Sequence, residues 1–141
     1  MIGVIIITHG NLADVFLEAF KLIMGEPKKI KAISLLSEDS PETLQRKISV
    51  AIEALSPNNG ILVLVDILGG TPFNIASKMV DNEKMAILTG INLPMLFSVG
   101  SHQHEMDLKT LTLEAEKAAK ESITNSFKLL HDQSSKNMRK I

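Results

Sequence analysis

The stretch IGVIIITHGNLADVF, residues 2–16, decides the fold class of this chain. Residues 2–8 are mostly β-branched and apolar, without polar alternation, which is typical of a parallel-sheet strand covered on both faces. Apolar residues then recur at helical spacing as far as Ile23, and a Gly and a Pro follow. The stretch therefore predicts a buried strand leading directly into an amphipathic helix, with His9 at the junction.

The same alternation continues through the rest of the chain. Strands are expected at 29–36, 61–66 and 85–90, and helices at 41–55, 72–80, 93–99 and 107–123. This order predicts an α/β fold with a doubly wound, mainly parallel sheet and helices on both faces. SFKLLH, residues 126–131, is interpreted as a last short strand. We expect a single domain over residues 1–131 and a solvated tail over 132–141.

Composition limits the classes of function that the chain can serve. Its 141 residues carry 15 basic and 16 acidic side chains and no Trp or Tyr, so a nucleic-acid partner is not expected. The absence of Cys excludes disulfides, thiolate metal sites and cysteine nucleophiles. No apolar run reaches the ~20 residues that cross a bilayer, and Met1 is followed directly by strand residues rather than a signal peptide. We therefore expect a cytoplasmic protein.

Three features follow the first and third strands, at the edge where open parallel sheets bind ligands. His9 ends the first strand, Asp66 ends the third, and GGTPFN at 69–74 leads from that strand into its helix. Each has an ordinary explanation: a loop histidine, a turn-capping Asp, and a helix start with Thr71 as cap and Pro72 at the first helical position. If the two strands are neighbours, as in a flavodoxin-like order, the three features meet in one crevice.

Together these residues suit the transfer of a phosphoryl group. A carboxylate at Asp66 that accepts a hydrogen bond from one nitrogen of His9 leaves the other nitrogen unprotonated and nucleophilic. Backbone amides at Gly70 and Thr71, at the start of a helix, can bind a phosphoryl oxygen. No cluster of ligands calls for a metal or another cofactor. His102 and His104 have a spacing that could bind a metal, but an isolated pair in a polar loop is better explained as solvated side chains.

Three segments of the chain resemble one family. They are IIITHG at 5–10, LVDILGGTPFNIAS at 64–77 and TGINLPML at 89–96. Their order and spacing resemble the enzyme IIA component of the mannose/fructose/sorbose family of the bacterial phosphoenolpyruvate-dependent sugar phosphotransferase system. The resemblance extends over residues 1–130.

The resemblance implies a phosphotransferase with a phosphohistidine intermediate. His9 would accept the phosphoryl group on Nε2 from the phosphocarrier protein HPr and pass it to a IIB component supplied in trans. Asp66 would orient the ring, and Gly69, Gly70 and Thr71 would bind the phosphate. The resemblance also implies a homodimer with an exchanged, antiparallel last strand, and contact with the membrane only through the transporter. It does not indicate which sugar is transported.

Other functions are compatible with parts of the pattern. The phosphotransfer subunit of phosphoenolpyruvate-dependent dihydroxyacetone kinase resembles the family at its N-terminus but tends to lack GGTPFN. A regulatory domain whose phosphorylation is sensed by a partner is a further possibility. A histidine phosphatase is disfavoured, because Thr8 stands where that class has Arg and only Arg46 and Arg139 supply guanidinium groups.

Overall fold

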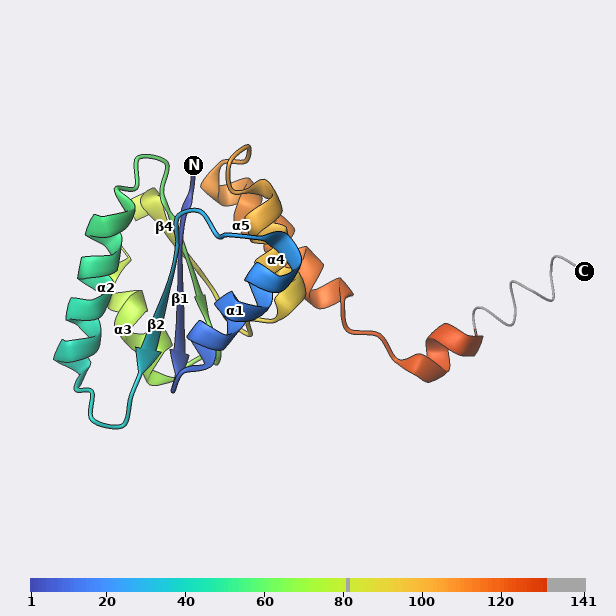
Figure 1. Cartoon of the computed structure of the whole chain (residues 1–141), viewed down its shortest axis with the longest axis horizontal. Coiled ribbons are helices and arrows are strands. Elements are labelled where there is room, and N and C mark those ends of the chain that lie inside the picture. Colours follow the sequence, from blue (N-terminus) through green and yellow to red (C-terminus); the bar gives the residue numbers. More distant parts are fainter. Residues whose placement is uncertain (81, 132–141) are drawn as a thin grey trace, which may run out of the picture.

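The computed structural model describes residues 1–80 and 82–131 (Figure 1). Strands and helices alternate through most of the chain. The strands are β1 (Gly3–His9), β2 (Ile30–Leu35), β3 (Ile61–Val65) and β4 (Met85–Leu88). The helices are α1 (Leu12–Met24), α2 (Pro41–Leu55), α3 (Thr71–Met79), a short 3-10 turn at Asn82–Lys84, α4 (Leu93–His102) and α5 (Leu108–Glu121).

The four strands form one parallel sheet in the order β2-β1-β3-β4. Its central pair is β1 and β3, with Gly3 opposite Ile61 and Ile7 opposite Val65. This order confirms the predicted doubly wound α/β fold and makes the first and third strands neighbours. The carboxyl ends of β1 and β3 therefore lie side by side.

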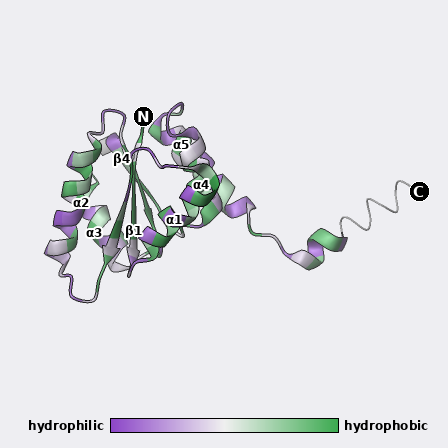
Figure 2. Cartoon of the chain, viewed as in Figure 1, coloured by the Kyte–Doolittle hydropathy of each residue, from purple (hydrophilic) through white to green (hydrophobic). Residues whose placement is uncertain are grey.

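Helices cover both faces of the sheet, α2 and α3 on one side and α1, α4 and α5 on the other (Figure 1). Successive residues of β1 face opposite layers: Val4 and Ile6 pack with α1, α4 and α5, whereas Ile5 and Ile7 pack with α2 and α3. All of β3 is buried, and the strands appear as an apolar centre between helices with polar outer faces (Figure 2). The unbroken apolar runs in the sequence are explained by this double coverage.

Local capping chemistry fixes where most of the helices begin. Ser40 accepts a hydrogen bond from the Thr43 amide at the start of α2, and Asp107 accepts one from the Thr110 amide at the start of α5. At α1 the hydroxyl of the buried Thr8 accepts a hydrogen bond from the amide of Ala13 at 2.7 Å. This bond ties the first turn of α1 to the end of β1, next to His9.

The interpretation of residues 126–131 as a strand is wrong for this chain: they are helical and leave the body of the domain (Figure 1). A strand needs a neighbouring sheet edge, and the described sheet ends at β2 and β4. Local bonds form instead: the Asn125 side chain accepts from the Phe127 amide at 3.0 Å, and the Asn125 carbonyl accepts from the Leu129 amide. The predicted tail, 132–141, lies outside the described residues.

Candidate functional site

The site forms where β1 and β3 end. His9 is the last residue of β1, and Asp66 directly follows β3. One carboxylate oxygen of Asp66, Oδ2, accepts hydrogen bonds from both the backbone N–H of His9 (2.9 Å) and the ring Nδ1 (2.8 Å). The sequence predicted that these residues converge, and the structure brings them together through two bonds to one oxygen.

Asp66 is held in its ionised form. Partial burial alone would raise the pKa of its carboxyl group, but the hydrogen bonds from the backbone and ring of His9, with the charge on that ring, outweigh burial and lower the pKa below its ordinary value. The second oxygen, Oδ1, accepts from the Ile67 amide at 3.0 Å. An ionised acceptor at Nδ1 keeps the proton on that nitrogen, so a neutral His9 ring presents an unprotonated Nε2.

The ring of His9 lies against the backbone of Gly70. A Cβ atom placed on Gly70 would be 2.9 Å from the ring Cε1 and 3.5 Å from Nε2, so a side chain here would press on the ring. Gly69 precedes it with a φ of +80°, a conformation that glycine adopts without strain. The two glycines thus serve different needs: Gly69 makes the turn, and Gly70 leaves room for the ring.

The first turn of α3 presents unpaired amides next to this contact. Gly70 is the residue before the helix, and no side chain caps it; Thr71 is the first helical residue rather than the cap that the sequence indicated. Its hydroxyl makes no hydrogen bond to the first turn, and within the described residues the Thr71 and Phe73 amides have no backbone acceptor. Such a helix start attracts anions, because its amides and the helix dipole point outward.

The ring of His9 is accessible from outside. Its side chain is 47% exposed, whereas the Asp66 side chain behind it is 11% exposed. Ile67 and Leu68, in the loop before the two glycines, are also exposed, at 59% and 69%. The site is therefore an open surface with a buried anchor, which suits a macromolecular partner better than an enclosed small molecule.

The family description "PTS system fructose IIA component" (EIIA-man) matches residues 3–116 of the chain. The chain belongs to the mannose-type enzyme IIA family of the bacterial phosphotransferase system. This confirms the resemblance carried by the three sequence segments.

Relatives in sequence agree with this membership. The chain is 35% identical over 112 residues to the PTS system fructose-specific EIIA component of Bacillus subtilis, covering 79% of this chain and 77% of that protein. It is 36% identical over 96 residues to the PTS system mannose-specific EIIAB component of Escherichia coli, covering 67% of this chain. The match spans only 30% of the length of the E. coli protein.

Solved structures of enzyme IIA proteins have the same fold. The phosphotransferase system component EIIA of Streptococcus agalactiae superposes with a TM-score of 0.83 at 28% identity, covering 91% of this chain and 99% of that one. The mannose/sorbose-specific IIA subunit of Enterococcus faecalis superposes with a TM-score of 0.79 at 26% identity, covering 88% and 93%. The flavodoxin-like architecture is thus shared along nearly the whole described chain.

His102 and His104 lie far from the site along the fold and do not join it. His102 is the last residue of α4, which extends beyond the predicted 93–99, and its Nδ1 is 2.7 Å from Oε1 of Glu105. Within the described part of the chain, no three His, Asp or Glu residues are grouped to hold a metal ion. No helix among those residues combines the length and apolar composition needed to cross a membrane.

Two features of the enzyme IIA site were missed from the sequence. One is the bond from the His9 backbone to Asp66, which depends on the exact twist of neighbouring strands and has no sequence signal. The other is the contact between Gly70 and the ring. The paired glycines after Asp66 carry a signal for it, since a second glycine beyond the one needed for a turn indicates a close approach of the backbone.

Proposed function

We propose that this enzyme IIA chain is a cytoplasmic phosphocarrier: it accepts a phosphoryl group from phospho-HPr on His9 and passes it to the IIB component of a mannose-family sugar uptake system. The observation that carries the proposal is the pair of hydrogen bonds from His9 to one oxygen of Asp66, which leaves Nε2 free on a side chain that is 47% exposed. The family membership supports the phosphotransferase class, and the named relatives support sugar uptake.

In the proposed step, the lone pair of Nε2 attacks the phosphorus atom of phospho-HPr. A new N–P bond forms, the N–P bond in the donor breaks, and the donor ring keeps that electron pair. Positive charge grows on the His9 ring as it loses its lone pair, and the ionised Asp66 at Nδ1 stabilises it. Transfer to IIB repeats the exchange with His9 as the donor instead of the acceptor. The two steps together need no net acid or base.

The phosphoryl oxygens need donors close to Nε2. Gly70 lies within contact of the ring, and the amides at Thr71 and Phe73 begin a helix whose N-terminus has no cap. We assign the phosphate to this turn, with Gly69 providing its shape and the Thr71 hydroxyl as an added donor. Charge developing on the transferring oxygens is stabilised by these preorganised amides, and the chemistry requires no metal.

The test is phosphorylation of the purified chain with phosphoenolpyruvate, enzyme I and HPr, followed by measurement of intact mass. One acid-labile phosphoryl group that depends on HPr is expected on the wild-type chain and on the matched control His104→Ala, but not on His9→Ala. Normal uptake by a folded His9→Ala protein would contradict the site assignment. Chasing the phosphorylated chain with a IIB domain, and separately with the dihydroxyacetone kinase subunits, distinguishes the two candidate acceptors.

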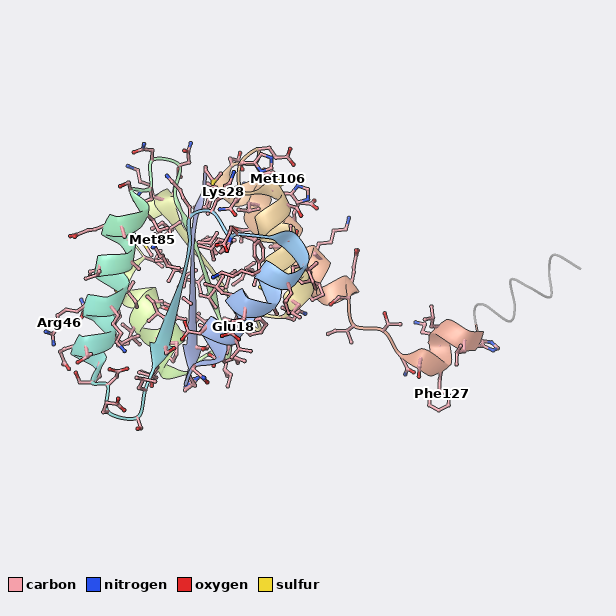
Figure 3. The ribbon with its side chains drawn as sticks, in the orientation of Figure 1. Glu18, Lys28, Arg46, Met85, Met106 and Phe127 are labelled. Carbon is pink, nitrogen blue, oxygen red and sulfur yellow. The ribbon has the colours of Figure 1, made fainter. Side chains whose placement is uncertain are left out.

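We also propose that the chain forms a homodimer. The support is the segment after α5, where apolar side chains lie open to solvent: Ile123 is 83% exposed, Phe127 85% and Leu130 61% (Phe127 in Figure 3). Apolar groups exposed together in this way favour burial against another surface. Sedimentation equilibrium is expected to give twice the chain mass for the wild type and the single chain mass for Phe127→Asp with Leu130→Asp.

A further inference from the structure

The sheet has an edge at β2 where, in the described chain, only Lys47 bonds an outward backbone group, the Ser34 carbonyl. At the two ends of the β1–β2 pair, the Val4 amide donates to the Lys29 carbonyl and the Gly10 amide donates to the Leu35 carbonyl. In a parallel ladder alternate residues face the neighbour, so odd-numbered residues of β2 face β1 and even-numbered ones face outward. The N–H and C=O groups of Ala32 therefore point away from the sheet, where an added strand would bond.

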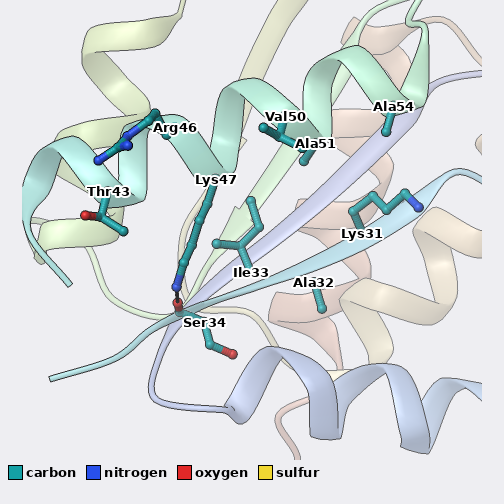
Figure 4. Close-up of a pocket in the computed structure, with 10 residues that line it drawn as sticks. All are labelled: Lys31, Ala32, Ile33, Ser34, Thr43, Arg46, Lys47, Val50, Ala51 and Ala54. Carbon is teal, nitrogen blue, oxygen red and sulfur yellow. Dashed lines mark hydrogen bonds between the residues drawn. The ribbon is translucent and has the colours of Figure 1, made fainter. Parts of the chain in front are cut away.

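Helix α2 extends beyond this edge. The residues of α2 that line the resulting groove recur at helical spacing, so they form one stripe along the helix. They are Thr43, Arg46, Lys47, Val50, Ala51 and Ala54. The groove has a volume of about 630 Å³, and its other wall is residues 31–34 of β2 (Figure 4). Val50 lines the groove and is 66% exposed. Such exposure of an apolar side chain is expected where no further strand lies beneath the helix.

The charges along the groove are all positive. Lys47 donates to the Ser34 carbonyl (Figure 4). It also donates to Asp39, and the ion pair neutralises its charge. Lys31 and Arg46 line opposite ends of the groove, and neither forms an ion pair with any carboxylate among the described residues. Figure 3 shows Arg46 projecting outward from α2. The groove thus has an apolar centre at Ile33 and Val50 between two unpaired cations.

We propose that this groove binds an extended acidic segment of a partner protein, which adds to the sheet as a strand beside β2. The outward groups of Ala32 pair with its backbone, and alternate side chains face α2. The side chains of the partner segment that face α2 are acidic, apolar and acidic in order. They lie opposite Lys31, Val50 and Arg46, respectively. A second copy of this chain is disfavoured, because pairing two β2 edges brings two such cationic walls together.

The probe is a fluorescein-labelled peptide, Thr-Asp-Thr-Val-Thr-Asp-Thr, titrated into the full chain without any phosphoryl donor. Fluorescence anisotropy measures its binding, and the NMR shift of the Ala32 amide reports its place. The Lys-for-Asp version of the peptide is the matched control ligand. Because His9 takes no part, His9→Ala is expected to bind the peptide like the wild type, so this result stands apart from the proposed phosphocarrier function.

Three variants separate the sources of affinity. Ala32→Pro removes the outward N–H without touching the ladder to β1 and is expected to weaken binding about fivefold, the loss of one hydrogen bond. Lys31→Glu with Arg46→Glu is expected to weaken it about tenfold at low salt. Lys117→Glu, an exposed charge reversal on α5, is the control and is expected to change nothing. Thermal melts establish that each variant is folded.

Several results would overturn the proposal. These are no binding of the acidic peptide, equal binding of the acidic and basic peptides, or binding that survives both Ala32→Pro and the double charge reversal. Self-association of the wild type that Ala32→Pro abolishes would assign the edge to a second copy instead.

Discussion

Gly70→Ala is expected to impair phosphoryl uptake while leaving the protein as stable as the wild type. The backbone of Gly70 has φ −74° and ψ 171°, an extended conformation that alanine adopts without strain. The added Cβ would lie 2.9 Å from Cε1 of His9, closer than real Cβ atoms come to a neighbour. The ring, as the exposed and movable partner, is the group that must shift.

The size of the effect follows from that distance. Restoring ordinary contact at 3.4 Å requires the ring to move by about 0.5 Å. A shift of that size away from Gly70 stretches or tilts the 2.8 Å bond between Nδ1 and Asp66. Because the ring is half exposed, this bond adds little to the stability of the fold. In the transition state, where positive charge grows on the ring, weakening the bond costs about 1–2 kcal/mol, which corresponds to uptake about five- to thirtyfold slower.

The assay is rapid-quench measurement of phosphorylation by phospho-HPr, with urea unfolding of the same samples. Gly69→Ala is the comparison. Its φ of +80° makes a side chain there cost about 1–2 kcal/mol of stability, and an added Cβ would meet no atom within 4 Å, so it would not press on the ring. The two variants are thus expected to differ in unfolding midpoint, which Gly69→Ala lowers and Gly70→Ala does not. Wild-type rates for Gly70→Ala would refute the assignment of Gly70 as the residue that positions the ring.

Further predictions concern the carboxylate and the remaining histidines. Asp66→Asn is expected to slow uptake and to leave the fold intact. The folded-state pKa of Asp66 is lowered from 3.8. The ionised carboxylate therefore contributes stability above pH 3.8, and this contribution is lost as the pH falls through the folded-state pKa. The difference in urea midpoint between wild type and Asp66→Asn should therefore hold at neutral pH and close below about pH 4. Replacing His102 and His104 together with Ala is expected to leave the uptake rate unchanged, and a large loss in the same rapid-quench assay would give that segment a role in transfer.

The sequence was sufficient to predict that His9 and Asp66 meet. Both follow apolar runs without alternation, and parallel strands that carry such runs end at one edge, so only the strand order had to be inferred. The start of α3 was less predictable. Whether Gly70 or Thr71 precedes the first helical residue depends on the turn that Gly69 makes. The same residues are compatible with either helix start.

The segment at 126–131 was the clearest failure, and its cause is nonlocal. Its apolar residues suit a strand only where a sheet edge is available to pair with them. In the described chain no such edge lies beside it, so the hydrogen bonds that Asn125 accepts from the Phe127 and Leu129 amides decide the local conformation. A sequence pattern cannot distinguish these outcomes because it does not specify what stands next to the segment.

The burial of β1 and β3 on both faces has a consequence for the motions of the site. Amides in such strands are bonded to neighbours and shielded by helices. We expect them to exchange their hydrogens only when the whole domain unfolds. His9 stands at the end of the first of these strands, and Asp66 follows the second. We therefore expect the backbone that carries His9 and Asp66 to be among the most slowly exchanging parts of the molecule, so that the site keeps its place from one encounter to the next.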